Sequence, residues 1–159
     1  MSIEKVRAEF EALGIAQRIL EFPVSSATVE LAAQAVGVEP ARIAKTLGFT
    51  MGDAVILVVC AGDTKVDNRR YKDTFHGKAA MVAYDQAEEL IGHAVGGVCP
   101  FAVNAGVALY LDVSLKRFET VFPAAGSSNS AIEMTMEELE RYTSATWVDV
   151  CKGWRQEEV

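Results

Sequence analysis

The sequence has no apolar run long enough to cross a membrane, and it has no repeat, low-complexity segment or linker. Its longest uninterrupted apolar run covers residues 54–61, whereas a membrane-spanning helix needs about 20 apolar residues. The first seven residues mix both charges and do not have the apolar stretch of a secretory signal. We therefore expect no association with a membrane.

Cysteine is scarce, with three widely spaced residues (Cys60, Cys99 and Cys151) and no C-x-x-C pair. A disulfide framework or a zinc site would need cysteines in pairs. We therefore expect no disulfide, no metal and no cofactor. Free cysteines are typical of a reducing compartment, which predicts a cytoplasmic location.

Positive charge is also scarce, because 15 Lys and Arg residues stand against 22 Asp and Glu residues and give a net charge of −7. This balance argues against a broad nucleic-acid-binding surface. Residues 65–78 depart from it, with two acidic residues and five basic ones: Lys65, Arg69, Arg70, Lys72 and Lys78. Such a segment fits a narrow contact with a polyanion, although a solvated helix face explains it equally well.

The chain has 159 residues and a mass of 17.2 kDa; half of the residues are apolar and 23% are charged. This composition excludes a disordered or collagen-like chain. At this length folding removes roughly two thirds of the unfolded surface from water, which is enough for a core without disulfides. Because single domains commonly run roughly 100–200 residues, we expect one domain over residues 1–159.

Apolar periodicity and capping residues predict short helices and strands in irregular alternation. The expected helices cover residues 2–13, 29–36 (capped by Thr28), 68–72 (capped by Asp67), 86–91 and 136–142 (started by a Thr135–Glu138 capping box), with helical turns at 40 and 114–118. The expected strands cover residues 15–22, 46–50, 54–60, 79–83, 107–111, 120–124 and 131–134. The second and third strands pair around a turn at 51–53, and the third is buried on both faces. The pattern indicates an α/β or α+β domain with a mixed sheet.

Lys45 is unusual because it lies where a short helix passes into an apolar strand. Burying an ammonium group is unfavourable unless an anionic partner compensates it, so this position favours a carboxylate or a ligand phosphate nearby. The alternative is a lysine whose stem packs while its charged end reaches water.

Residues 96–101 (Gly-Gly-Val-Cys-Pro-Phe) form the second unusual segment. Paired glycines allow positive φ and a close approach to a ligand, while Pro100 fixes the shape of the loop. Such a loop can direct N–H groups at a developing oxyanion without any catalytic side chain. An ordinary tight turn is the alternative.

Two further segments allow more than one interpretation. Cys99 is a candidate nucleophile with His93 or His76 as its base, although free cysteines usually act as small apolar residues. The run Ser-Ser-Asn-Ser at 127–130, after Gly126, is either a polar turn or a loop that faces a ligand.

Taken in order, these segments resemble the YbaK/ProX family, the bacterial aminoacyl-tRNA deacylases related to the editing domain inserted in prolyl-tRNA synthetase. The likeness covers residues 3–143, nearly the whole chain. The matching segments are the helix 28–36, residues 43–47 (Ile-Ala-Lys-Thr-Leu), the strand ending at 62–63, residues 66–70 (Val-Asp-Asn-Arg-Arg), residues 97–100 (Gly-Val-Cys-Pro) and residues 125–134 with the capped helix that follows.

The resemblance implies a compact mixed sheet, partly barrel-like and flanked by helices. It also implies hydrolysis of the ester between a wrongly attached amino acid and the 3′-terminal ribose of a tRNA, in particular tRNA-Pro or a related tRNA. An aminoacyl ester is already activated, so catalysis can come mainly from positioning and oxyanion stabilisation.

Carried onto this sequence, the resemblance assigns roles to particular residues. Gly97 and Pro100 shape the loop that holds the carbonyl group and orients the attacking water, and Lys45 contacts the terminal phosphate or ribose. The expected substrate-binding residues are Thr46, Gly96, Val98, Cys99, Gly126 and Asn129. The expected contacts with the acceptor stem of the tRNA are Lys65, Arg69, Arg70 and Lys72, and docking on a synthetase would compensate for weak affinity.

The sequence departs from the family pattern at three places. Arg69 and Arg70 replace a common Lys-Lys pair and keep its charge, and Ala61 stands where proline commonly precedes a Gly-Asp turn. Ala131 stands where members that remove cysteine tend to carry an acidic residue, which argues against cysteine as the amino acid removed. Pockets discriminate a single methylene by only about 1–3 kcal/mol, so the sequence specifies neither the amino acid nor the oligomeric state.

Two other classes of function remain open at this point. The first is a non-catalytic module that binds tRNA or a synthetase and has lost turnover. The second is a cysteine hydrolase centred on Cys99.

Overall fold

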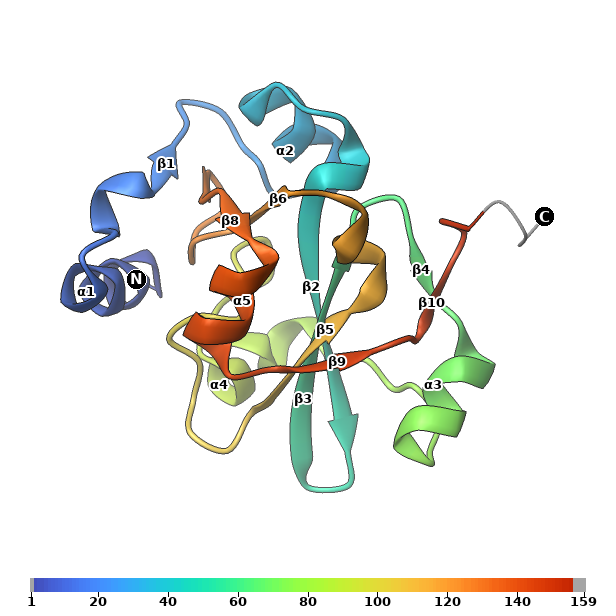
Figure 1. Cartoon of the computed structure of the whole chain (residues 1–159). Helices are drawn as coiled ribbons and strands as arrows, with labels where there is room; N and C mark the ends of the chain where they lie inside the picture. The colour runs from blue at the N-terminus through green and yellow to red at the C-terminus, as the bar shows by residue number, and fades with distance from the viewer. Residues whose placement is uncertain (1, 156–159) are drawn as a thin grey trace.

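The computed structural model of the protein describes residues 2–155 (Figure 1). Its α-helices are α1 (Ser2–Leu13), α2 (Val29–Val36), α3 (Asn68–Phe75), α4 (Ala87–Ile91) and α5 (Met136–Thr143). Its strands are β1 (Leu20–Glu21), β2 (Ile43–Met51), β3 (Ala54–Ala61), β4 (Lys65–Val66), β5 (Ala108–Asp112), β6 (Thr120–Pro123), β7 (Ser130–Ala131), β8 (Met134–Thr135), β9 (Thr146–Val148) and β10 (Cys151–Lys152). Short 3₁₀ helices cover Ala16–Arg18, Pro40–Arg42, Tyr84–Gln86 and Val113–Arg117. No helix in the described range is long and apolar enough to cross a membrane.

The main sheet has six strands in the order β8-β6-β2-β3-β5-β9 and curls into a half-barrel. The β2–β3 hairpin is antiparallel, from Ala44 opposite Ala61 to Met51 opposite Ala54. β6 pairs with β2, β5 with β3 and β9 with β5 in parallel. Two small antiparallel sheets, β1–β7 and β10–β4, complete the arrangement. The predicted mixed, partly barrel-like sheet with flanking helices is confirmed.

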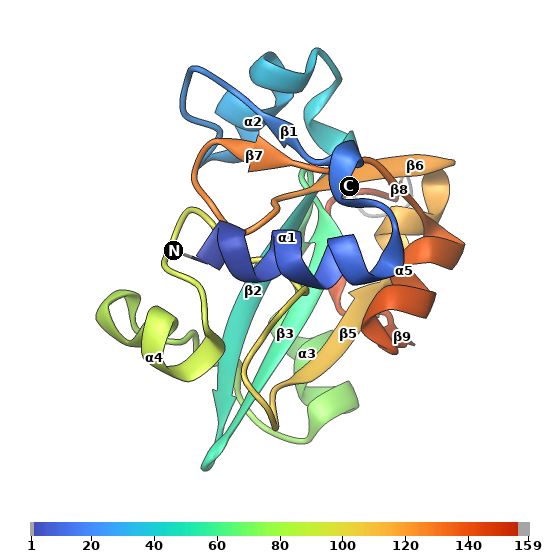
Figure 2. The same ribbon diagram turned by 90° about the vertical axis from the view of Figure 1, so that its left-hand side faces the viewer.

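The β2–β3 hairpin separates two layers of the core. On one face of β3, Val59 packs in a cluster with Val6 and Phe10 of α1. On the other face, Val58 packs in a cluster with Tyr71 and Phe75 of α3. Figure 1 and Figure 2 show α1 and α3 on opposite sides of the hairpin. Strand β3 is therefore buried on both faces, as its uninterrupted apolar sequence predicts.

Capping side chains begin three helices at the predicted positions. Thr28 Oγ1 accepts a hydrogen bond from the Leu31 N–H at 3.2 Å, and the Asp67 carboxylate accepts from two N–H groups at the start of α3. At α5, Thr135 Oγ1 accepts from the Glu138 N–H while the Glu138 carboxylate accepts from the Thr135 N–H. This is the reciprocal capping box that the sequence predicts.

Two predicted strands are largely absent. Residues 15–22 form a 3₁₀ turn followed by the two-residue strand β1, because the Ile15 N–H bonds back to the Phe10 carbonyl at the end of α1. Residues 79–83 make one isolated bridge, between Met81 and Phe49. The predicted helix near 86–91 is a 3₁₀ turn followed by α4.

The chain after Trp147, which the sequence left unassigned, is held by a buried carboxylate. Asp112 is fully buried; one oxygen accepts from the Val150 N–H at 2.8 Å and the other from the Ser114 N–H at 2.9 Å. A buried carboxylate that accepts two backbone bonds is satisfied. The residues on either side of Val150 then pair as β9 and β10.

An ion pair joins the first 3₁₀ turn to α5. The Arg18 guanidinium donates to both carboxylate oxygens of Glu138, at 2.6 and 3.0 Å. This hydrogen bonding is the largest cause that lowers the pKa of Glu138, from its ordinary 4.5 to about 2. Because the folded-state pKa is depressed, the pair contributes stability above the ordinary value, and that contribution is lost as the pH falls through the folded value.

We predict that the free energy of unfolding falls more steeply between pH 4.5 and 2 in the wild type than in Glu138→Gln. Glutamine keeps an oxygen that can accept from the Thr135 N–H but removes the titrating charge. Urea denaturation midpoints measured across this pH range test the expectation. Parallel pH profiles for the two proteins would contradict it.

Candidate functional site

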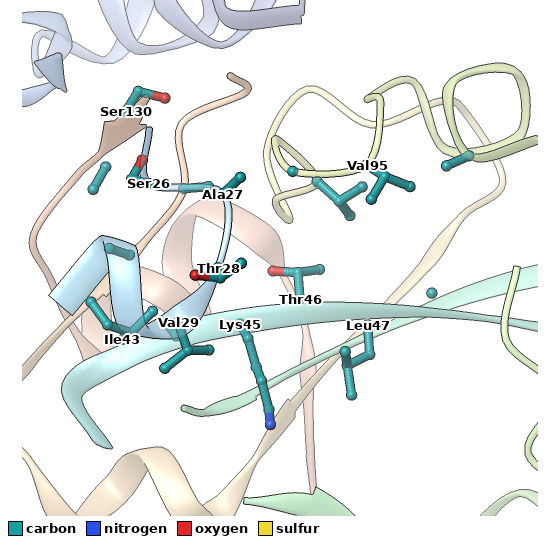
Figure 3. Close-up of a pocket in the computed structure, with 18 of the residues that line it drawn as sticks. Ser26, Ala27, Thr28, Val29, Ile43, Lys45, Thr46, Leu47, Val95 and Ser130 are labelled. Carbon is teal, nitrogen blue, oxygen red and sulfur yellow. The ribbon is translucent and has the colours of Figure 1, made fainter. Parts of the chain in front are cut away.

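One cavity of about 290 Å³ opens beside β2 (Figure 3). Its lining comes from four parts of the chain that are distant in sequence: residues 26–32, 43–48, 81–98 and 122–131. Most of the lining side chains are apolar, and the polar ones are Ser26, Thr28, Lys45, Thr46 and Ser130. The cavity therefore brings the segment around Lys45 and the glycine loop together, although about fifty residues separate them.

The cavity lies at an interruption of the sheet. On the side of β2 that faces away from β3, β6 pairs only with Ile43 and Ala44. Further along the same edge, the Val82 N–H donates to the Gly48 carbonyl at 2.9 Å. Val82 and Phe122, one from each of these flanking segments, both line the cavity. The cavity therefore occupies the place where a neighbouring strand is missing.

Thr46 and Lys45 project from opposite faces of β2, because successive strand residues alternate. Figure 3 shows the Thr46 side chain on the side of Ala27 and Val95, and the Lys45 side chain on the other side of the strand. The Thr46 Oγ1 atom is buried and has no hydrogen-bond partner. The predicted binding residue Thr46 thus presents an unsatisfied hydroxyl group to the cavity.

The Lys45 ammonium group lies on the face of the hairpin that α3 covers. Lys45 is opposite Cys60 in the register, and its Nζ donates to the Thr64 carbonyl. It forms no ion pair with any residue in the range 2–155. The structure therefore places Lys45 in the cavity wall but does not bring its ammonium group together with the glycine loop.

The glycine loop reaches the cavity through Gly96 and Val98. Gly96 has a φ of +97°, which glycine adopts without strain. The Gly97 N–H is already used, because it donates to the Ala94 carbonyl at 3.0 Å. A Cβ atom on Gly97 would lie 2.9 Å from backbone atoms of Gly126 and Ser127. Gly97 is therefore required for packing between two loops, and neither it nor Pro100 lines the cavity.

Cys99 is fully buried outside the cavity lining. Burial raises the pKa of its thiol to about 12. Its Sγ lies 3.5 Å from Nε2 of His93, but that nitrogen is 2.6 Å from the Phe101 carbonyl and must donate its proton there. Burial also lowers the pKa of His93. The pair therefore does not have the arrangement of an activated cysteine nucleophile, and His76 ends α3 on the other face of the hairpin.

Gly126 and Asn129 also lie outside the cavity lining. A Cβ atom on Gly126 would lie 2.9 Å from the backbone of Ile3, so this glycine permits the turn to pack on α1. Asn129 donates through Nδ2 to the Phe22 carbonyl at 3.0 Å and accepts from the Ser127 hydroxyl at 2.9 Å. These bonds hold a polar turn, and only Ser130 of the 127–130 run lines the cavity.

Lys65 belongs to β4, and Arg69, Arg70 and Lys72 belong to α3, on the opposite face of the hairpin from the glycine loop; Lys78 follows α3. Arg70 pairs with Asp149 at 3.3 Å and with Asp67 at 3.9 Å. Lys65, Arg69 and Lys72 are exposed. The segment therefore lies on the Lys45 face of the hairpin, and none of its basic residues lines the cavity.

Several lining residues were not found from the sequence. Ser26 is bound through its N–H to the Ser128 carbonyl at 2.7 Å, which fixes the chain before α2 beside β7. Val82, Ile91 and Phe122 contribute apolar wall. The sequence around these residues does not distinguish them from core residues, because a serine or an apolar residue that lines a cavity has the same neighbours in sequence as one that packs in a core. No group of three or more His, Cys, Asp or Glu residues that could hold a metal occurs within residues 2–155.

We predict that Gly97→Ala lowers the free energy of unfolding by about 1–3 kcal/mol, the usual range for overpacking, because its Cβ would contact the backbone of the 126–127 turn. Gly77→Ala is the matched control, since nothing lies within 4 Å of its added Cβ atom. Urea denaturation of both variants tests the expectation. Equal midpoints for the two variants would contradict it.

Comparisons with known proteins show similarity in sequence and in fold. An uncharacterized protein of Bacillus subtilis (strain 168), YwhH, is 51% identical over 156 residues, which are 97% of this chain and 99% of that protein. The crystal structure of a candidate trans-editing enzyme for prolyl-tRNA synthetase is 30% identical, with a TM-score of 0.86 over 96% of this chain and 98% of that one. The crystal structure of a hypothetical protein is also 30% identical, with a TM-score of 0.84 over 93% of this chain and 99% of that one.

The match to a family model covers residues 24–142 and so includes β2, the glycine loop and every part of the cavity lining. The model is that of the aminoacyl-tRNA editing domain. This match spans more than half of the chain and takes in both the Lys45–Thr46 segment and the glycine loop. The chain belongs to the aminoacyl-tRNA editing domain family.

Proposed function

We propose that this protein is a trans-acting editing enzyme that hydrolyses the ester bond of mischarged aminoacyl-tRNA, with tRNA-Pro or a related tRNA as the carrier. Membership in the editing family supports the general activity. The likeness to a candidate trans-editing enzyme for prolyl-tRNA synthetase supports action beside that synthetase. The observation that carries the proposal is the cavity beside β2, in which the Lys45–Thr46 segment meets the glycine loop.

The cavity suits an aminoacyl group. Its volume of about 290 Å³ lies at the lower end of the range for small-molecule pockets, about 300–1,000 Å³. Apolar walls from Val29, Ile43 and Val98 surround the space. A small amino-acid side chain fits there, while the ribose and the rest of the tRNA remain at the mouth.

Hydrolysis needs no side-chain nucleophile in this proposal. Water attacks the ester carbonyl carbon, the bond from that carbon to the ribose oxygen breaks, and the ribose oxygen takes a proton. The products are a free amino acid and a tRNA with a free 3′ end. Because the Gly97 N–H is occupied, the proposal assigns the donor role to the N–H groups of Gly96 and Val98, the two loop residues that line the cavity. Fixed N–H donors of this kind stabilise a developing oxyanion.

Lys45 has a separate role in the proposal, as the contact to the terminal phosphate. Its ammonium group is half-buried with a neutral carbonyl as its acceptor and no carboxylate partner among the described residues. A phosphate is a better partner for such a group. The edge of β2 beside Lys45 has no neighbouring strand, so the side chain can exchange the Thr64 carbonyl for a phosphate at that edge.

The exposed residues Lys65, Arg69 and Lys72 lie on the same face of the hairpin as the Lys45 ammonium group. We place the acceptor stem of the tRNA along this face. Arg70 contributes less there, because Asp67 and Asp149 already pair with it.

We predict that the wild-type protein deacylates at least one member of a panel of mischarged tRNAs and leaves correctly charged prolyl-tRNA intact. Lys45→Met, which keeps an unbranched apolar side chain and removes the charge, lowers kcat/KM at least 10-fold, as expected for a lost charge-assisted bond of about 1.5–3 kcal/mol. Lys78→Met is the control, because Lys78 belongs to the basic segment but lies outside the cavity lining. Release of radiolabelled amino acid measures the rates.

Two results of this panel would overturn the proposal. Binding of tRNA without ester hydrolysis on any substrate would make the protein a binding module. Full activity of Lys45→Met, with circular dichroism confirming its fold, would remove Lys45 from the site.

A second prediction separates backbone-assisted hydrolysis from a cysteine nucleophile. At pH 8 the Cys99 thiol stays protonated and buried, since its pKa is about 12, and thiolates rather than thiols are alkylated. We therefore expect iodoacetamide to leave Cys99 unmodified in the native protein and to modify it in urea, as measured by mass spectrometry. Rapid labelling of native Cys99 with loss of deacylation would favour the cysteine hydrolase.

A further inference from the structure

The hydrogen-bonding direction of β2 can be read from its two contacts with residues 80–82. The Gly48 carbonyl accepts from the Val82 N–H at 2.9 Å, and the Thr50 N–H donates to the Ala80 carbonyl at 2.8 Å. Backbone groups alternate in direction along an antiparallel strand. The even-numbered residues of β2 therefore direct both N–H and C=O away from β3.

Thr46 follows the same alternation, so its N–H and C=O point toward the interruption between β6 and residues 80–82. β6 pairs only as far as Ala44, and the bridge on the other side begins beyond Gly48. Phe122 from β6 and Val82 from the other segment both line the same cavity. No strand among the described residues pairs with Thr46 on this side.

The Thr46 hydroxyl group is, like the Thr46 N–H and C=O groups, without a partner among the described residues on this side of the strand. Its Oγ1 is buried without a hydrogen-bond partner. Other hydroxyl groups of the cavity wall are occupied: Thr28 Oγ1 caps α2, and Ser130 Oγ bonds to Ser127 at 2.8 Å. Leaving a buried polar group unsatisfied is unfavourable, so a ligand that completes these bonds gains affinity.

An aminoacyl group has a donor and an acceptor that can pair with the Thr46 C=O and N–H groups. Its amino nitrogen and its carbonyl oxygen flank one Cα atom, as the N–H and C=O of a strand residue do. In an antiparallel ladder, the two residues of a hydrogen-bonded pair exchange both N–H···O=C bonds. A single aminoacyl residue can therefore take the place of one residue of the missing strand.

We infer that Thr46 recognises the free α-amino group of the substrate, an inference that rests on the proposed function. The amino group donates one hydrogen to the Thr46 carbonyl and a second to Oγ1, while the Thr46 N–H donates to the ester carbonyl oxygen. The site therefore selects aminoacyl esters whose amino group is free. An N-acylated or peptidyl ester has one hydrogen fewer to donate, so its nitrogen cannot bond to both the Thr46 carbonyl and Oγ1.

A stable probe tests the inference without requiring catalysis. In 3′-alanylamino-3′-deoxyadenosine an amide replaces the ester, and the N-acetyl form of the same compound masks the amino group. Isothermal titration calorimetry measures the Kd of both probes. We expect the N-acetyl probe to bind the wild type at least 10-fold more weakly, as for the loss of a hydrogen bond whose partner stays buried.

The variants separate a recognition role from a structural one. Thr46→Val keeps the shape of the side chain and removes Oγ1, and it should raise the Kd of the free-amine probe about 10-fold and reduce the discrimination between the probes. Thr46→Ser restores the hydroxyl group and should recover both properties. Thr50→Val is the matched control on the same strand and in the same orientation, where Oγ1 bonds to the Ala80 carbonyl outside the cavity; it should bind both probes as the wild type does.

Three results would overturn the inference: equal Kd values for the two probes in the wild type, unchanged discrimination in Thr46→Val, or no binding of the free-amine probe. A failure of the proposed hydrolysis is a different result. If no aminoacyl-tRNA is deacylated but the probes are still discriminated through Thr46, the hydrolase proposal is wrong and the amino-group site stands.

Discussion

Between Ala44 and Gly48, β2 is hydrogen-bonded to a strand on one side only, and the position of the cavity depends on this interruption. β6 pairs with β2 only at Ile43 and Ala44 and ends at Pro123, whose carbonyl accepts from the Ile132 N–H at 3.0 Å. On the other flank, residues 79–83 make one bridge instead of a strand. Residues of α2 and of the glycine loop line the gap left between these segments, so the interruption of the sheet becomes a walled cavity that stays open to solvent.

Strand alternation separates the side chains of two predicted site residues that are adjacent in the sequence. Lys45 and Thr46 are consecutive, so their side chains cannot face the same layer of the protein. Thr46 faces the aminoacyl cavity, and Lys45 faces the layer covered by α3. If the chain edits aminoacyl-tRNA as proposed, Thr46 on one face of β2 contacts the amino acid, and Lys45 on the other face contacts the RNA backbone. The substrate would then pass the edge of β2 that has no neighbouring strand.

Features of the fold that depend on neighbouring residues could be predicted from the sequence, and features that depend on distant partners could not. The caps at Thr28 and Thr135 involve bonds across three residues, and they were predicted correctly. Strands β9 and β10 depend on the buried Asp112, which is remote in sequence. Residues 79–83 form one bridge, between Met81 and Phe49, instead of the predicted strand. In the site, the sequence identified segments that meet, but it could not distinguish a glycine that lines a cavity from one that packs.

That distinction is clearest in how the glycine loop is supported. Gly97 packs on the 126–127 turn, and Gly126 in turn packs on the first residues of α1. α1 also holds both ends of the loop region, because Lys5 donates to the Gly92 carbonyl at 3.1 Å and the Glu9 carboxylate accepts from the Ala102 N–H at 3.2 Å. The family match begins only at residue 24 and omits α1. The glycine loop packs on the 126–127 turn, and this turn packs on α1, so α1 supports the position of the loop beside the cavity. This helix is therefore a structural part of the site, although it contributes no side chain to the cavity wall.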